Sequence, residues 1–373
     1  MTTLEATGRR VVVTAFGETP LDAVDNCLSI EEQPPPDPGR LRPTDVVIAV
    51  KSAAVGWVDL LMTSGQYQHM PKPPYCPGLE YSGVVAWTGP EVDPSAIAVG
   101  DRVLADGLLT GPRSVGDYQQ YGGFASYAVA PAKAVLPLPE RFSFDQGCCL
   151  LGNYETAYHC LIACGALKRG ETVLIHGATG STGLAAVHVA KLVGATVIAT
   201  GRSEEKLDVV REQGADHVLC SKPADGAPGF REEVKALTGG RGVDVVYDSI
   251  GGAISLESMR CVAFGARFLI VGWAATPFVA RGKGQRGAPN ANVLPTNLIM
   301  MKGLKVIGCP TAISTLRDPS IRGPRLAQIL GWVEAGSLSP LVGRAYPLAR
   351  VREAMKAKWA SDFVGGCVLH PAE

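Results

Sequence analysis

The sequence lacks the features that mark membrane, secreted and nucleic-acid-binding proteins. No apolar run in its 373 residues approaches the roughly 20 residues that a membrane-spanning helix needs. The segment after Met1 has no basic stretch followed by an apolar one, as a secretion signal would. The 35 lysines and arginines balance 35 aspartates and glutamates, so no net charge attracts nucleic acid or an anionic membrane. We therefore expect a cytoplasmic protein that acts on a small molecule.

The sequence also lacks a cysteine framework. Its ten cysteines are scattered along the chain, and no Cys-x-x-Cys occurs. This spacing argues against structural disulfides and against a zinc ribbon. Cys148 and Cys149 stand inside an apolar run, which favours buried, neutral thiols.

The strongest local pattern is a glycine-rich turn between a predicted strand and a predicted helix. Residues 172–175 form a short apolar run that is typical of a buried parallel strand. Gly177, Gly180 and Gly183 follow, so the backbone can bend tightly and approach a pyrophosphate without a Cβ in the way. Backbone amides at the start of the helix would face that anion. The pattern predicts a dinucleotide-binding turn.

Two other classes of glycine-rich site do not fit. A P-loop requires Lys-Ser or Lys-Thr after the last glycine, and neither follows Gly183. A short-chain reductase is disfavoured because the glycines lie in mid-chain and no Tyr-x-x-x-Lys occurs.

The two halves of the chain carry different patterns. Predicted strands separated by turns dominate the first half and cover residues 11–13, 45–50, 81–86 and 101–104. They indicate a small, partly open β-barrel. From Ser143 onward strands alternate with helices, which predicts an α/β, doubly wound parallel sheet. In this half we expect helices over residues 254–262 and 325–335, and a last strand over 366–369 that returns to the first domain.

Further motifs occur in a fixed order at residues 59–67, 77–80, 99–103, 122–127, 156–158, 244–251 and 297–302. Together with the glycine turn, they resemble the medium-chain dehydrogenase/reductase superfamily, specifically its zinc-free quinone oxidoreductase and enoyl reductase branch. The resemblance implies a GroES-like domain over residues 1–136, completed by residues 309–373. It also implies a Rossmann NADP-binding domain over residues 137–308.

The resemblance implies catalysis without zinc. The zinc alcohol dehydrogenases of the superfamily carry Gly-His-Glu where this chain has Gly78-Leu79-Glu80, and their four-cysteine lobe is absent. Leucine cannot ligate zinc. The implied reaction is hydride transfer from NADPH to an already polarised acceptor: a quinone, an enal or enone, or an enoyl thioester. The alternative is an NADPH-binding protein with little or no turnover and a sensor or interaction role.

Tyr67 is the implied catalytic residue, because it matches the tyrosine of the family's Gly-x-Tyr motif. Its phenol would donate to the developing oxyanion. A tyrosine with only a shape role at the wall of the site fits equally well. Gly56 stands where many quinone oxidoreductases have an asparagine that contacts the nicotinamide or substrate. A strict quinone-reductase mechanism therefore does not follow from the resemblance.

The residues after the second predicted strand indicate the choice of cofactor. NAD enzymes carry an Asp or Glu about 20 residues beyond the glycines, where this chain has Gly201-Arg202-Ser203 and then Lys206. These cations favour the 2′-phosphate of NADP, although a solvated helix start would look alike. The residues assigned to the cofactor are Thr156, Gly177, Gly180, Ser181, Thr182, Gly183, Arg202, Ser203 and Lys206. Thr156 is included because the resemblance places its hydroxyl at the nicotinamide carboxamide.

Other segments carry weaker predictions. Arg281, Lys283 and Arg286 form a basic loop that either meets an acyl-CoA phosphate or is plain surface. Residues 297–302 and 304–308 lie where family members pair edge strands, which implies a homodimer. Four histidines lack metal spacing and are expected to be structural: His69, His159, His176 and His188.

Overall fold

The computed structural model describes residues 4, 6–67, 71–222, 229–275 and 292–373. The described residues fall into two compact units. The first contains those within Met1–Gly152 and Ser339–Glu373, and the second those within Asn153–Val279 and Ala288–Leu338. Residues 309–338 thus lie in the second unit, although the sequence placed them with the first. The physical reason is that a helix over residues 322–334 forms ion pairs with Glu155.

The first unit is built on a seven-stranded sheet with the order β14-β15-β3-β4-β5-β7, in which β6 also pairs with β3. Its strands are β3 (Asp45–Ala54), β4 (Glu80–Thr88), β5 (Arg102–Ala105), β6 (Tyr127–Pro131), β7 (Val135–Pro137), β14 (Val342–Pro347) and β15 (Gly366–His370). A ribbon of β1 (Gly8–Val13) and β2 (Leu28–Gln33) forms a separate antiparallel pair. Since β15 pairs antiparallel with β3, the C-terminal strand belongs to the first unit's sheet.

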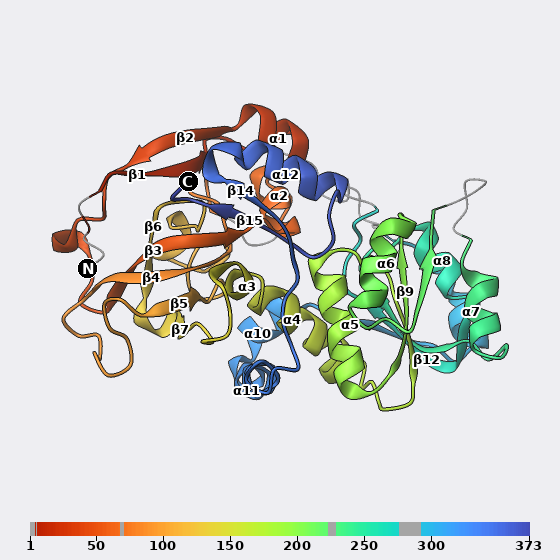
Figure 1. Cartoon of the computed structure of the whole chain (residues 1–373). Helices are drawn as coiled ribbons and strands as arrows, with labels where there is room; N and C mark the ends of the chain where they lie inside the picture. The colour runs from red at the N-terminus through yellow and green to blue at the C-terminus, as the bar shows by residue number, and fades with distance from the viewer. Residues whose placement is uncertain (1–3, 5, 68–70, 223–228, 276–291) are drawn as a thin grey trace. The chain divides into compact units, whose positions relative to one another are not determined.

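Short helices complete the first unit. They are α1 (Pro20–Asn26), α2 (Trp57–Thr63), α3 (Phe144–Cys148) and α12 (Val351–Ala360), with single turns η1 (Pro38–Arg40), η2 (Asp117–Gln120), η3 (Ala132–Ala134) and η7 (Leu348–Arg350). Figure 1 shows α1, α2 and α12 gathered beside one end of the sheet. Ile48, Leu60, Tyr81, Phe124 and Met355 share the core beneath them.

The second unit contains a six-stranded parallel sheet with the order β10-β9-β8-β11-β12-β13. Its strands are β8 (Thr172–Ile175), β9 (Thr196–Gly201), β10 (His217–Cys220), β11 (Val243–Asp248), β12 (Val262–Ile270) and β13 (Lys305–Gly308). The strand order reverses between β8 and β11, and in such sheets ligands bind at the carboxyl ends of the strands beside this reversal. The predicted fold class, a Rossmann sheet plus a GroES-like β-barrel, is confirmed.

Helices cover both faces of the parallel sheet. They are α4 (Leu151–Tyr158), which continues as the π-helical turn η4 (His159–Cys164), then α5 (Ser181–Val193), α6 (Glu204–Glu212), α7 (Arg231–Leu237), α8 (Ala253–Ser258), α9 (Thr296–Met301), α10 (Thr311–Arg317), η6 (Pro319–Ile321) and α11 (Arg322–Glu334). In Figure 1, α5 and α6 lie on one side of β9, and α7 and α8 on the other.

Two predicted elements are wrong. The helix expected over residues 254–262 ends at Ser258, and Val262 begins β12 because it pairs with Val243 of β11. Residues 297–302, expected at a strand edge, form helix α9, and of the two segments only the second forms an edge strand, β13. A short apolar run fits either a strand or a helix, and its leucine and methionines have high helix propensity.

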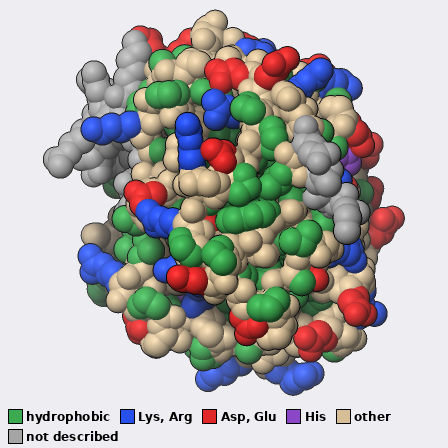
Figure 2. All heavy atoms as spheres, turned by 90° about the vertical axis from the view of Figure 1, so that its left-hand side faces the viewer, with side chains coloured by type: hydrophobic (Ala, Val, Ile, Leu, Met, Phe, Trp, Pro, Cys, Tyr) green, Lys and Arg blue, Asp and Glu red, His purple; other side chains and the backbone are tan. Residues whose placement is uncertain are grey.

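The surface carries charges of both signs. On the face shown in Figure 2, Lys and Arg side chains alternate with Asp and Glu, in keeping with the formal net charge of zero. Within the described ranges, no helix is long and apolar enough to cross a membrane.

Candidate cofactor and active site

The glycine turn lies directly after β8 and leads into α5. Gly177 has φ +64°, and a Cβ there would lie 3.0 Å from both Ser249 Oγ and Ile250 Cδ1. A Cβ on Gly183 would overlap the carbonyl oxygen of Gly177, so the helix packs directly on the turn. Gly180 is the N-cap residue of α5. These are the conditions under which backbone amides can approach a phosphate, so the turn fits a dinucleotide.

A buried histidine lies immediately before the turn. His176 has no exposed surface, and its Nδ1 and Nε2 lie 2.8 Å from Thr200 Oγ1 and 2.6 Å from Ser258 Oγ. Since the Ser258 hydroxyl donates to Ile254 O at 2.7 Å, its oxygen accepts the N–H of Nε2. Burial lowers the pKa of His176 to about 4, so the ring is neutral and Nδ1 accepts from Thr200. The imidazole thus joins the carboxyl ends of β8 and β9 to α8.

The end of β11 is fixed by a second polar cluster. Asp248, 1% exposed, accepts the N–H groups of Ile250 and Gly251, both at 2.9 Å, and the hydroxyl of Ser255. The Ser249 hydroxyl donates to the carbonyl of His176 at 3.2 Å. This contact links the carboxyl ends of β8 and β11, the two strands between which the strand order reverses, next to the glycine turn.

The residues predicted to bind a 2′-phosphate lie at the carboxyl end of β9. Arg202 is exposed and directly precedes the N-cap of α6, and Lys206 is half-buried within the first turn of this helix. Ser203, also assigned to the cofactor, is the N-cap of α6, where its hydroxyl accepts the N–H of Lys206 at 3.5 Å. The Ser221 hydroxyl donates to Gly201 O at 3.1 Å and fixes the strand end.

Three further predicted cofactor residues lie on helices α4 and α5. The Thr182 hydroxyl in the first turn of α5 donates to Asn153 Oδ1 of α4 at 3.0 Å, so this hydroxyl is engaged within the protein. Thr156, one turn further along α4, is half-buried. Ser181 is the first residue of α5, directly after Gly180.

In the first unit, Tyr67 is half-buried and follows α2. No hydrogen bond to its hydroxyl is present among the described residues. Gly56 is the N-cap residue of α2. A Cβ there would lie 2.9 Å from Asp59 Oδ2, so a side chain at this position would have to displace the Asp59 carboxylate.

The sequence did not single out Asp59, which organises this region. Its Oδ2 accepts the N–H of Gly56 at 2.8 Å, and its Oδ1 accepts those of Gly78 and Leu79, both at 3.1 Å. Burial raises the pKa of Asp59 to about 6, against the opposing effect of these hydrogen bonds. An acid three residues after a glycine N-cap was the available signal.

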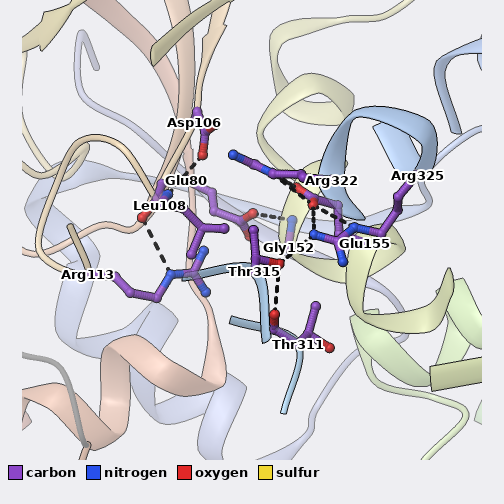
Figure 3. Close-up of polar contacts among 11 residues, drawn as sticks. Glu80, Asp106, Leu108, Arg113, Gly152, Glu155, Thr311, Thr315, Arg322 and Arg325 are labelled. Carbon is purple, nitrogen blue, oxygen red and sulfur yellow. Dashed lines mark hydrogen bonds and ion pairs between the residues drawn. The ribbon is translucent and has the colours of Figure 1, made fainter. Parts of the chain in front are cut away.

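The neighbouring loop carries no set of metal ligands. Leu79 is 4% exposed, and the Glu80 carboxylate accepts the backbone N–H of Gly152 (Figure 3). A Cβ on Gly152 would lie 2.5 Å from Glu80 Oε1, so a side chain here would displace the Glu80 carboxylate. Across the part of the chain that the structure describes, no three His, Cys, Asp or Glu residues are grouped to hold a metal ion. Every cysteine is a free thiol, and most are buried.

Some predictions fall outside the described residues. Arg281, Lys283 and Arg286 of the basic loop, and His69, belong to this group.

Comparison with known proteins identifies both units. A family model described as alcohol dehydrogenase GroES-like domain matches residues 42–140, and one described as zinc-binding dehydrogenase matches residues 181–316. Human quinone oxidoreductase is 30% identical over 309 residues, which cover 83% of each chain. Bovine quinone oxidoreductase-like protein 2 is 31% identical over 318 residues, covering 85% of this chain and 82% of the relative.

A solved structure adds information on the cofactor. A mycobacterial protein in complex with NADPH superposes with a TM-score of 0.77 at 28% identity, covering 98% of this chain and all of that one. The parallel sheet, the glycine turn and this similarity together indicate that the chain binds a nicotinamide cofactor. The chain is therefore an oxidoreductase and belongs to the medium-chain dehydrogenase/reductase superfamily, in the branch of the quinone oxidoreductases.

Proposed function

We propose that the protein is an NADPH-dependent reductase that transfers hydride, without zinc, to a quinone or to a C=C bond conjugated with a carbonyl group. The observation that carries this proposal is Leu79. A side chain without a donor atom stands where zinc-dependent members of the superfamily have a histidine. Without a Lewis acid, alcohol oxidation is difficult, whereas a conjugated acceptor is already polarised.

Several of the assigned residues have a defined task in this reaction, among them Thr156, whose hydroxyl contacts the nicotinamide carboxamide. The backbone amides of Gly180 to Gly183 hold the pyrophosphate, and Arg202 and Lys206 hold the 2′-phosphate. The bound cofactor supplies a hydride to the acceptor. Tyr67 donates a hydrogen bond, and then a proton, to the oxygen that becomes anionic, and solvent returns the proton to the phenol.

Gly56 bears on the choice of acceptor. Because this residue has no side chain, it cannot supply the amide contact that an asparagine gives in many quinone oxidoreductases. We therefore extend the acceptor class from quinones to enals, enones and enoyl thioesters.

The proposal is tested by incubating the protein with NADPH and a panel of quinones, enals, enones and enoyl thioesters while following the absorbance of the reduced nicotinamide. NADPH oxidation with at least one acceptor class, lowered in Tyr67→Phe, is the expected result. Tight NADPH binding with no oxidation across the panel would favour the alternative, a binding protein with a sensor or interaction role.

We also propose that the enzyme is a homodimer. Strand β13 lies at the edge of the parallel sheet, so one side of it can pair with a strand of a second copy. Phe264 of β12 is 85% exposed, and Met300 of α9 is 75% exposed. Exposed large apolar side chains beside an edge strand support an interface between two copies of the chain.

A further inference from the structure

A buried cluster of two arginines and one glutamate lies within the nucleotide-binding unit, and the proposed reaction does not use it. Glu155 comes from α4, and Arg322 and Arg325 come from α11. Their side chains are 5%, 11% and 3% exposed. Figure 3 shows both guanidinium groups converging on the single carboxylate.

The hydrogen bonds fix the orientation of the carboxylate. Arg322 binds it in a bidentate manner, with Nε 3.0 Å from Oε2 and Nη2 2.7 Å from Oε1. Arg325 donates from Nε at 2.9 Å and from Nη2 at 2.6 Å, both to Oε2. Bidentate arginine–carboxylate pairs constrain geometry more strictly than a point charge does.

The cluster continues into α10. Nη2 of Arg325 also donates to Thr315 Oγ1 at 2.7 Å, and the Thr315 hydroxyl donates to the carbonyl of Thr311 at 2.9 Å (Figure 3). Both guanidinium groups thus pair with the one carboxylate of Glu155. Buried ion pairs are weak evidence for stability, because well-packed apolar residues at the same positions often stabilise a fold equally well. The cluster is therefore better explained by the geometry that it imposes than by stability.

The residues on either side of Glu155 show what this geometry serves. The three residues Asn153, Tyr154 and Glu155 are all bonded to other helices, since Asn153 accepts from Thr182 and Tyr154 O–H lies 2.8 Å from His188 Nδ1. Thr156 follows, and within the described ranges its hydroxyl has no hydrogen-bond partner. On a helix, residues three apart share a face, so Thr156 lies on the face by which Asn153 meets the first turn of α5.

We propose that Glu155, Arg322 and Arg325 are positioning residues, which hold α4 in the rotation that presents the Thr156 hydroxyl to the nicotinamide carboxamide. This inference rests on the proposed function. A hydrogen bond weakens steeply when its angle is lost, so a small rotation of α4 removes the contact. The glycine turn and Arg202, which hold the pyrophosphate and the 2′-phosphate, do not belong to α4, so we expect the adenine end of the cofactor to bind as before.

The test compares two ligands on Glu155→Gln, which keeps the side-chain shape and removes the charge. NADPH carries the nicotinamide, and 2′-phosphoadenosine 5′-diphosphoribose lacks it. We expect the Kd of NADPH to rise about fivefold, the equivalent of one neutral hydrogen bond of about 1 kcal/mol. The Kd of the fragment should stay the same, and kcat should fall. Glu353→Gln, which removes an exposed Arg–Glu pair of the first unit, is the control and should change neither ligand's Kd.

A second comparison tests whether the cluster acts through Thr156. Thr156→Val should weaken NADPH binding to the same extent as Glu155→Gln. The double variant should lose no more NADPH affinity than either single variant. If Glu155→Gln does not fold, Arg322→Lys replaces it, because lysine keeps the charge and gives up the bidentate geometry.

Three results would overturn the positioning role alone. They are an equal rise in the Kd of both ligands, no rise in either Kd, and additive losses of NADPH affinity in the double variant. Wild-type protein that binds both ligands equally and oxidises no NADPH would overturn the proposed function, and the inference with it.

Discussion

Acidification should destabilise the nucleotide-binding unit through His176, because its imidazole is held neutral. Burial lowers the pKa of this residue to about 4, while the nearby Asp248 carboxylate opposes the shift. The ordinary pKa of histidine is about 6.5. Between these values the unfolded chain binds a proton that the folded chain does not, so stability falls as the pH falls. The contribution is fully present above pH 6.5 and is lost as the pH approaches 4.

The size of the effect follows from these pKa values. Linkage gives a loss of about 2 kcal/mol in the free energy of unfolding between pH 7 and pH 5. Asp59 acts in the opposite direction, because a carboxyl pKa raised to about 6 lets the folded state bind the extra proton. The comparison must therefore be made with a variant that keeps Asp59 and cannot titrate at position 176.

His176→Gln meets this requirement, since its amide does not titrate. Urea unfolding followed by circular dichroism at pH 7 and pH 5 gives the free energy for both proteins. The wild type should lose about 2 kcal/mol more than the variant over this interval. Parallel pH dependence in the two proteins would refute the assignment of a neutral, buried His176.

Three further predictions concern single sites. Asp59→Asn turns an acceptor oxygen into a donor that faces backbone N–H groups, so the free energy of unfolding should fall by about 1–3 kcal/mol in urea titrations; unchanged stability would argue against the three hydrogen bonds. Arg202→Ala with Lys206→Ala should raise the Kd of NADPH roughly ten- to hundredfold per lost contact and leave that of NADH nearly unchanged, whereas equal weakening would mean that both side chains only support the fold. Light scattering should give the mass of a dimer for the wild type and a shift toward monomer for Phe264→Asp, and a monomeric wild type would contradict the proposed interface.

The parts of the fold that could be predicted from the sequence are those that depend on local sequence patterns. The strand at residues 172–175 and the glycine turn were predictable because a β-branched run and three spaced glycines have few alternative structures. The start of β12 was not, since it depends on pairing between Val262 and the distant Val243. Its pairing in the sheet, rather than its intrinsic helix or strand propensity, determines the secondary structure of that segment.

The polar contacts of the site were less accessible to sequence reasoning. Glu155 and Arg322 are separated by 167 residues, and no spacing rule connects them. Asp59 accepts from backbone N–H groups about 20 residues away, which leave no trace in the sequence. Ser203 shows the opposite case: a serine before Glu204 and Glu205 is a recognisable helix start, and capping is the task of its hydroxyl in the structure.

The most direct test of zinc-free hydride transfer is the turnover of protein whose zinc content has been measured. Purified enzyme is treated with a chelator, its zinc is quantified, and NADPH oxidation with a quinone or enone is recorded before and after treatment. We expect an unchanged rate at zinc contents far below one ion per chain. A rate that falls with zinc and returns when zinc is restored would contradict it.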